Sequence, residues 1–151
     1  MGYGLELIVV HFSNQSDISV DSFISLYESV GWSAYTTDPA KLARAIANSS
    51  LVISAWQENE LVGLVRCVTD NETIAYIQDI LVNPDYQGQG IGDELMRLLL
   101  ANLKGIRQIV LMTDEGASSQ HLHDWYRKFG FKTFKEWGTI GFAIITSDSQ
   151  K

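Results

Sequence analysis

Hydrophobic positions along the first third of the chain follow a helical spacing. Apolar residues recur every three or four positions over 20–30, and again over 42–47, as they do on the buried face of a helix. Asp17 or Ser19 can cap the first segment, and Pro39 follows an aspartate at the start of the second. This pattern predicts two helices, at 20–30 and 39–48.

The middle of the chain changes to strand-like runs of β-branched, aromatic and aliphatic residues. Three such runs cover 51–57, 61–69 and 73–82. They are separated by the short polar segments 58–60 and 70–72, which are long enough only for tight turns. The sequence therefore predicts a three-stranded antiparallel meander.

Six further elements are predicted around this meander. They are a first strand at 5–11, a leucine-striped helix at 91–103, a strand at 109–112, a fourth helix at 120–129 and a closing strand pair at 131–135 and 138–146. The order of these elements predicts a protein with both helices and strands (α/β in the broad sense, α+β in the narrow one). Its sheet is expected to be mixed, mostly antiparallel and of about seven strands, flanked by about four helices. Because no linker or repeat interrupts the pattern, residues 1–151 are expected to form one domain.

Composition narrows the range of partners. The chain has 151 residues, of which 46% are hydrophobic, and its 11 Lys and Arg against 18 Asp and Glu give a net charge of -7. An acidic chain of this kind is not expected to bind nucleic acid, which requires clustered Lys and Arg. The acidity fits either electrostatic steering of a cationic amine or ordinary solubility.

The cysteine count, the N-terminal pattern and the lengths of the apolar runs indicate in which cell compartment the protein is expected. Cys67 cannot form an intrachain disulfide, which fits a reducing cytosol. The start of the chain shows no export signal, and no apolar run reaches the roughly 20 residues that span a bilayer. A cytoplasmic protein with no membrane partner is expected. No metal is expected either, since three histidines and one cysteine lack ligand spacing.

The segment Gln87-Gly88-Gln89-Gly90-Ile91-Gly92 carries the clearest chemical signal. It lies between a predicted strand and a predicted helix, where the first-turn N–H groups and the helix dipole favour an anion and glycines allow close approach. It is neither a P-loop, because no Gly-Lys-Ser/Thr follows, nor a Gly-x-Gly-x-x-Gly dinucleotide fingerprint. A phosphate-bearing ligand is predicted here.

Read as Gln-x-x-Gly-x-Gly, this loop resembles the acyl-CoA pyrophosphate loop of the GNAT superfamily of N-acetyltransferases. Residues 79–86 (DILVNPDY) are similar to the segment that precedes that loop in the family, and residues 125–131 (WYRKFGF) are similar to a second family motif further along the chain. The resemblance implies acetyl transfer from acetyl-CoA to a primary amine, by direct attack in a ternary complex.

The same resemblance implies roles for particular residues. Backbone groups of the glycine loop would hold the pyrophosphate, and a bulge in the fourth strand would free backbone groups for the pantetheine arm and the thioester carbonyl. Tyr126 would be the general acid that protonates the leaving thiolate. Ser119 stands where many relatives have an asparagine on the pantetheine, or it caps the fourth helix. The implied cofactor-binding residues are Ile80, Leu81, Val82, Gln87, Gly88, Gln89, Gly90, Ile91, Gly92, Ser119 and Tyr126.

The general base is open at this point. Tyr76 occupies the position of a glutamate in many family members, and an un-ionised tyrosine is a poor base. Asp79 is the nearest carboxylate, but strand alternation turns it away from the face of Tyr76 unless a bulge intervenes, and it can equally serve as a structural hydrogen-bonding group. His121, His123 and water are the alternatives.

The acceptor is expected to be a small-molecule amine, bound by the first two helices and the closing strands. These segments are rich in aromatic residues, and 27–48 with 79–82 is similar to the plant-type and bacterial serotonin N-acetyltransferase branch. The alternatives are a non-catalytic acyl-CoA-binding module and a protein acetyltransferase. The resemblance also implies a homodimer formed through 131–146. The aromatic residues are Tyr27, Trp32, Tyr35, Trp137 and Phe142.

Overall fold

The computed structural model describes residues 9–15 and 17–146. The chain divides into two compact units, in which the described residues are 9–15 with 17–111 in the first unit and 112–146 in the second. A single domain over the whole chain stays a prediction.

The first unit is built on a mixed five-stranded sheet in the order β1-β2-β3-β4-β5. Neighbouring strands are antiparallel from β1 (His11–Ser13) through β2 (Leu51–Gln57) and β3 (Glu60–Thr69) to β4 (Ile74–Val82), and β5 (Gln108–Leu111) runs parallel to β4. The predicted meander is therefore confirmed. Its turns at Glu58 and Asn71 each place one non-glycine residue at positive φ.

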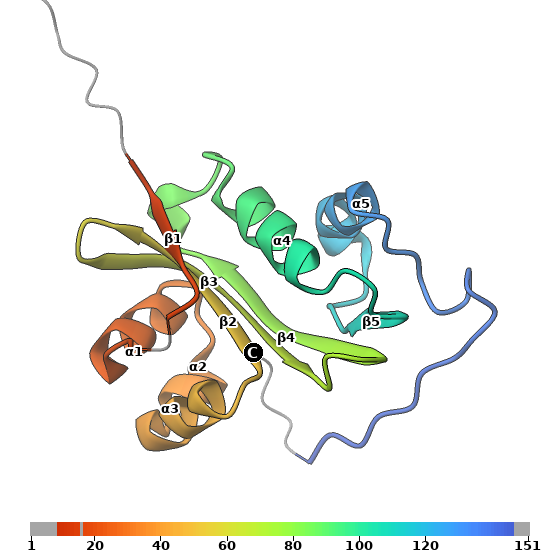
Figure 1. Ribbon diagram of the computed structural model, residues 1–151, viewed down its shortest axis with the longest axis horizontal. Coiled ribbons are helices and arrows are strands. Elements are labelled where there is room, and N and C mark those ends of the chain that lie inside the picture. The colour runs from red at the N-terminus through yellow and green to blue at the C-terminus, as the bar shows by residue number, and fades with distance from the viewer. Residues whose placement is uncertain (1–8, 16, 147–151) are drawn as a thin grey trace, which may run out of the picture. The chain divides into compact units, whose positions relative to one another are not determined.

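Helices cover both faces of this sheet. α1 (Val20–Ser29), α2 (Ser33–Thr36) and α3 (Pro39–Ala47) lie on one face and α4 (Ile91–Asn102) on the other (Figure 1). The predicted caps are present, since Ser19 Oγ accepts from Ser22 N at 3.2 Å and Asp38 Oδ1 from Lys41 N at 3.1 Å. The apolar core under α1 and α3 consists of Phe23, Leu26, Tyr27, Leu42, Ile46, Val52, Leu61, Leu64 and Leu81.

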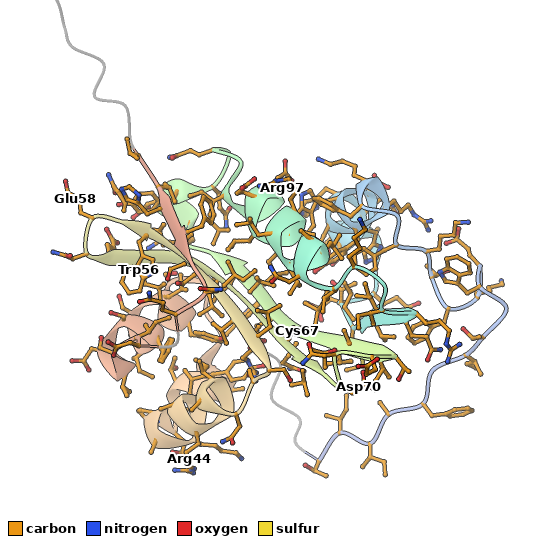
Figure 2. The ribbon with its side chains drawn as sticks, in the orientation of Figure 1. Arg44, Trp56, Glu58, Cys67, Asp70 and Arg97 are labelled. Atoms are coloured by element: carbon orange, nitrogen blue, oxygen red, sulfur yellow. The ribbon has the colours of Figure 1, made fainter. Side chains whose placement is uncertain are left out.

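The opposite face depends on a glycine in β3. A Cβ on Gly63 would lie 3.1 Å from Ile91 Cγ2 and 3.2 Å from Leu95 Cδ1, so the absence of a side chain lets the start of α4 pack directly onto the sheet. Cys67 lies near the end of the same strand (Figure 2) and is fully buried. Burial raises the pKa of its thiol to about 11, as expected for a core residue.

The second unit contains α5 (Gln120–Lys128), preceded by a 3₁₀ turn, η2 (Ala117–Ser119). The predicted closing strands at 131–135 and 138–146 are wrong, because within the described chain those residues form turns and irregular structure. Alternating apolar residues become a strand only where a neighbouring strand completes the hydrogen-bond ladder, and no strand pairs with these residues. Over the residues that the structure describes, the sheet thus has five strands instead of about seven, and a dimer through 131–146 stays a prediction.

Element boundaries differ modestly from the sequence expectations. The four predicted helices are present, and each ends one residue before its predicted end, while the short α2 is additional. The first strand begins at His11 and runs to Ser13, whereas 5–8 lie outside the described residues. β5 is only partly buried, and Met112, predicted as its end, is exposed and belongs to the second unit.

Candidate functional site

The glycine loop forms the start of α4 in the way that a phosphate site requires. A 3₁₀ turn, η1 (Pro84–Tyr86), leads into it, and Gln87 Nε2 donates to Val82 O at 3.1 Å. Gly88 and Gly90 have φ of 79° and 80°, a region that disfavours side chains. Gly90 occupies the N-cap position, so no side chain caps the helix there. The end of α4 therefore keeps the positive pole and backbone donors that fit a pyrophosphate.

The conformation of the loop and one nearby ion pair agree with this fit. A Cβ at Gly88 or Gly90 would meet no atom within 4 Å, so the backbone conformation, rather than crowding, explains both glycines. Glu94 in the first turn is paired with Arg97, whose Nε lies 2.8 Å from Glu94 Oε2, and this partly offsets the local negative charge. Ile91 is buried in the core, so only its backbone can serve a ligand.

β4 contains the bulge that the family resemblance implied. Arg66 pairs with Asp79 and Cys67 with Ile77, so Gln78 is the extra residue in β4. β5 pairs with β4 only as far as Ile77, which faces Leu111. Beyond that point β4 is paired with β3 alone within the described chain. The backbone edge of 78–82 is therefore the stretch that can bind an extended ligand, including the predicted residues Ile80, Leu81 and Val82.

The bulge changes which residues share a face of the sheet. Tyr76 is opposite Val68 and Asp79 is opposite Arg66, and these two partners are two residues apart in β3, so their side chains point the same way. Unbroken alternation would have separated Tyr76 from Asp79. The charge of Asp79 also contributes, after burial, to raising the pKa of Tyr76, which agrees with this proximity. The bulge thus meets the condition under which Asp79 reaches that face.

Asp79 is the centre of a buried hydrogen-bonded group that we call the Asp79 cluster. Arg66 Nε and Nη2 lie 2.9 and 2.8 Å from Asp79 Oδ2. Tyr27 Oη donates to Oδ2 at 2.9 Å and Tyr35 Oη to Oδ1 at 2.8 Å, while Gln78 Nε2 donates to Tyr35 Oη at 2.9 Å. The Asp79 side chain is fully buried. The cluster consists of Asp79, Arg66, Tyr27, Tyr35 and Gln78.

Burial and the carboxylate act on the two tyrosines of this cluster in the same direction. Desolvation, followed by the negative charge of Asp79, raises the pKa of Tyr35 to about 12 and raises the pKa of Tyr27 further. Both phenols therefore stay protonated at neutral pH and remain donors to Asp79. Of the two roles open to Asp79, these contacts favour the structural hydrogen-bonding group over the base.

The aromatic residues expected at the acceptor site do not all behave alike. Tyr27 is fully buried and packs edge-on against Trp32 and Tyr35, with ring centroids 5.9 and 5.0 Å away. Trp32 and Tyr35 are only partly buried. Trp137 and Phe142 are 62% and 92% exposed in the second unit. Within the first unit, then, Trp32 and Tyr35 remain as candidate contacts for an acceptor.

Tyr126 is held in the second unit by aromatic neighbours. Its ring centroid lies 5.1 Å from that of Trp125 and 6.0 Å from that of Phe131, and the residue is 9% exposed. Burial raises the pKa of its phenol, partly opposed by a hydrogen bond with the Thr113 side chain. A phenol in this setting keeps its proton at neutral pH, as a general acid must.

The remaining candidates of the second unit differ in their surroundings. Ser119 occupies the N-cap position of α5, but its side chain makes no capping hydrogen bond. A ring nitrogen of His123, Nε2, lies 2.7 Å from the carbonyl oxygen of Asp114, whereas His121 is exposed. In the described ranges, no group of three or more His, Cys, Asp or Glu side chains could hold a metal ion, and no helix is long and apolar enough to cross a membrane.

Comparison with known proteins agrees with this geometry. The model of the acetyltransferase (GNAT) family matches residues 18–131. The chain belongs to the GNAT family. It is 34% identical over 131 residues to the N-acetyltransferase ycf52 of Porphyra purpurea, a match that covers 84% of this chain and 72% of that protein. It is 32% identical to the histone acetyltransferase TAP1 of Glycine max, covering 83% of this chain and 57% of TAP1.

Solved structures show the same fold. A GNAT family acetyltransferase from Streptococcus pneumoniae is 29% identical, with a TM-score of 0.78 over 93% of this chain and 100% of that one. This GNAT chain is accordingly an N-acetyltransferase with an α+β fold. Serotonin does not appear in the names of these relatives, so an arylalkylamine acceptor is not part of what the family match establishes.

Sequence reasoning missed the partners of Asp79. Arg66 is the single charged residue in the interior of the apolar strand β3. Asp79 is likewise the single charged residue of the apolar strand β4. Two opposite charges, each isolated in adjacent strands of a predicted hairpin, are a signal for a buried cross-strand pair. That signal could have identified Arg66. The hydroxyl contacts of Tyr27 and Tyr35 leave no comparable pattern in the sequence.

Proposed function

We propose that this GNAT chain transfers the acetyl group of acetyl-CoA to a primary amine, by direct attack within a ternary complex, and that the amine is a small molecule. The proposal rests on the start of α4, where a glycine is the N-cap and no side chain caps the helix. This helix start follows the part of β4 that is no longer paired with β5. Bound acetyl-CoA supplies the activated acyl group. Cofactor binding, polarisation of the carbonyl and proton transfer are assigned to residues of this chain.

Binding is assigned to backbone groups. The N–H groups from Gln87 to Gly92 hold the pyrophosphate, because they lie at the positive end of α4 and glycines allow close approach. The edge of Ile80, Leu81 and Val82 binds the extended pantetheine arm and polarises the carbonyl. Ser119 adds a hydroxyl to this set.

Proton transfer to the leaving group is assigned to Tyr126 Oη. Its buried phenol carries the proton at neutral pH because desolvation raises its pKa. The attacking amine must lose a proton in turn. Asp79, whose oxygens already accept from Arg66, Tyr27 and Tyr35, is less suited to that role than water or a histidine.

The test is thiol release from acetyl-CoA with tryptamine, spermidine, lysine and a lysine-containing peptide, for the wild type and for Tyr126→Phe. We expect turnover on at least one amine and a loss of roughly 10²-fold or more in kcat for the variant, with acetyl-CoA affinity unchanged. In the wild type, kcat should decline at alkaline pH, and this decline should be absent in Tyr126→Phe, which lacks the hydroxyl. Tight acetyl-CoA binding without thiol release on any amine would instead favour a non-catalytic acyl-CoA-binding module.

A protein acceptor is the second candidate, and two observations favour it. TAP1 of Glycine max is named a histone acetyltransferase. In addition, a pocket of about 550 Å³ between α1 and the β2–β3 turn is lined by the carboxylates Asp21, Glu58 and Glu60 (Glu58 is marked in Figure 2). Acidic side chains there would attract a lysine-rich segment. If Glu58→Lys lowers kcat/KM for the lysine-containing peptide but not for tryptamine, the protein acceptor is supported.

A further inference from the structure

The hydroxyl of Tyr35 stands apart from the rest of the Asp79 cluster. Tyr27 and Arg66 are buried, whereas Tyr35, on the short helix α2, is only partly buried. Its partner Gln78 is the bulge residue of β4, at the point where β4 and β5 stop pairing. Tyr35 therefore brings a side-chain hydroxyl to the part of the sheet where the proposed function locates the thioester.

The orientation of this hydroxyl is fixed from two sides. Tyr35 Oη donates its proton to Asp79 Oδ1 at 2.8 Å and accepts from Gln78 Nε2 at 2.9 Å. A phenol oxygen with these two bonds retains one acceptor position. Donation to a carboxylate in a buried setting also polarises the oxygen, which makes it a better acceptor for an incoming N–H group.

The charge of the cluster suits a neutral amine better than an ammonium ion. Asp79 is neutralised by Arg66, whose guanidinium carbon also lies 5.9 Å from the centre of the Tyr35 ring. Because the pair carries no net charge, a cationic ligand beside Tyr35 would lose hydration without gaining an uncompensated carboxylate as its partner. A neutral amine donating N–H to Tyr35 Oη avoids that cost, and only the neutral amine has the lone pair needed for attack.

We infer that the Tyr35 hydroxyl contacts the acceptor amine and orients it for attack, and that Asp79 acts in the reaction through Tyr35, as a positioning residue. This inference rests on the proposed function and adds the acceptor side of the same site. Arg66 and Gln78 hold Asp79 and Tyr35 in place. Tyr27 donates to the same carboxylate but is fully buried, so it stabilises the fold without reaching the acceptor.

Tyr27 and Tyr35 provide a matched pair of substitutions, since each Tyr→Phe change removes one hydroxyl from the same carboxylate. The assay uses whichever of tryptamine, spermidine, lysine or a lysine-containing peptide is turned over fastest. We expect Tyr35→Phe to lower kcat/KM for the amine about tenfold or more, mainly through KM, with the acetyl-CoA Kd within about twofold of wild type. Tyr27→Phe should lower Tm but leave kcat/KM within about twofold.

Asp79→Asn separates positioning from base catalysis. If Asp79 acts through Tyr35, the Asn variant and the double variant with Tyr35→Phe lose about as much kcat/KM as Tyr35→Phe alone, and the acid limb of the pH profile keeps its midpoint. If Asp79→Asn removes that limb or costs far more than Tyr35→Phe, Asp79 is the base and the inference is wrong. Should the Asn variant not fold, the tyrosine pair decides.

The outcomes also separate this inference from the proposed function. Wild-type turnover with equal kcat/KM in the Tyr27→Phe and Tyr35→Phe variants would overturn the role of Tyr35 and leave the acetyltransferase intact. Absence of wild-type turnover on every amine would remove the proposed function, and the role of Tyr35 with it.

Discussion

Arg66 and Asp79 face each other directly across β3 and β4, and both Nε and Nη2 of the arginine lie within 2.9 Å of one carboxylate oxygen. The pair lies next to the bulge at Gln78 and is almost fully buried. Two tyrosine hydroxyls also donate to this carboxylate. The arrangement joins α1 and α2 to the strand edge proposed to bind acetyl-CoA.

Breaking this pair from one side should be costly. Arg66→Met leaves a buried carboxylate with tyrosine donors but without a cation, so we expect it to lower the free energy of unfolding by about 3–5 kcal/mol in urea denaturation. The matched control is Arg97→Met, which breaks the exposed pair with Glu94 and should cost less than about 1 kcal/mol. Equal losses of unfolding free energy in the two variants would show that the buried pair contributes no more to stability than the exposed one.

Two glycines with the same backbone conformation allow the phosphate site to be tested. Gly90 and Gly105 have φ of 80° and 92°, and a Cβ at either would meet no atom within 4 Å. Alanine at either position should therefore cost about 1 kcal/mol of stability from backbone strain. Only Gly90→Ala should also weaken acetyl-CoA binding, by about tenfold in Kd measured by calorimetry. Similar weakening by Gly105→Ala would contradict the assignment of the loop.

The second unit should respond to acid through Glu136. Hydrogen bonds from Arg127 and from Thr133 hold the pKa of this carboxyl at about 2, below its usual 4.5. A lowered pKa means that the stabilisation is present above about pH 4.5 and is lost as the pH falls through about 2. The amide of Trp137, bonded to Thr133 O, reports on this turn by hydrogen exchange.

In the wild type, the protection of that amide, corrected for intrinsic exchange, should fall between pH 4.5 and pH 2. Glu136→Gln should give low protection across the whole range. Glu115→Gln, at an exposed carboxyl of the same unit, should behave as the wild type. Protection that is independent of pH in all three proteins would contradict the prediction.

The sequence predicted those parts of the fold that depend on local patterns. The meander and the helices could be located because their apolar spacing and their caps, such as Ser19 and Asp38, are features of residues close together in the sequence. The loop from Gln87 to Gly92 was found for the same reason. The apolar alternation of 138–146 misled, because strand formation depends on a partner strand that the segment itself does not encode.

The candidate site was less predictable because it depends on one register shift. Without the bulge at Gln78, alternation puts Asp79 on the face away from Tyr76, and its contacts with Tyr27 and Tyr35 could not form. A bulge is a property of two paired strands. Tyr27 and Tyr35 lie 52 and 44 positions before Asp79 in the chain, and no local pattern connects either tyrosine with it.

Direct transfer from acetyl-CoA to an amine is tested most directly by mixing the protein with acetyl-CoA first without and then with the amine, and by following thiol release and the mass of both protein and product. The account predicts that no thiol is released and no acetyl group is added to the protein until the amine is present, after which one N-acetylated amine appears for each thiol. Acetylated protein formed before the amine is added, or no thiol release with any amine, would contradict it.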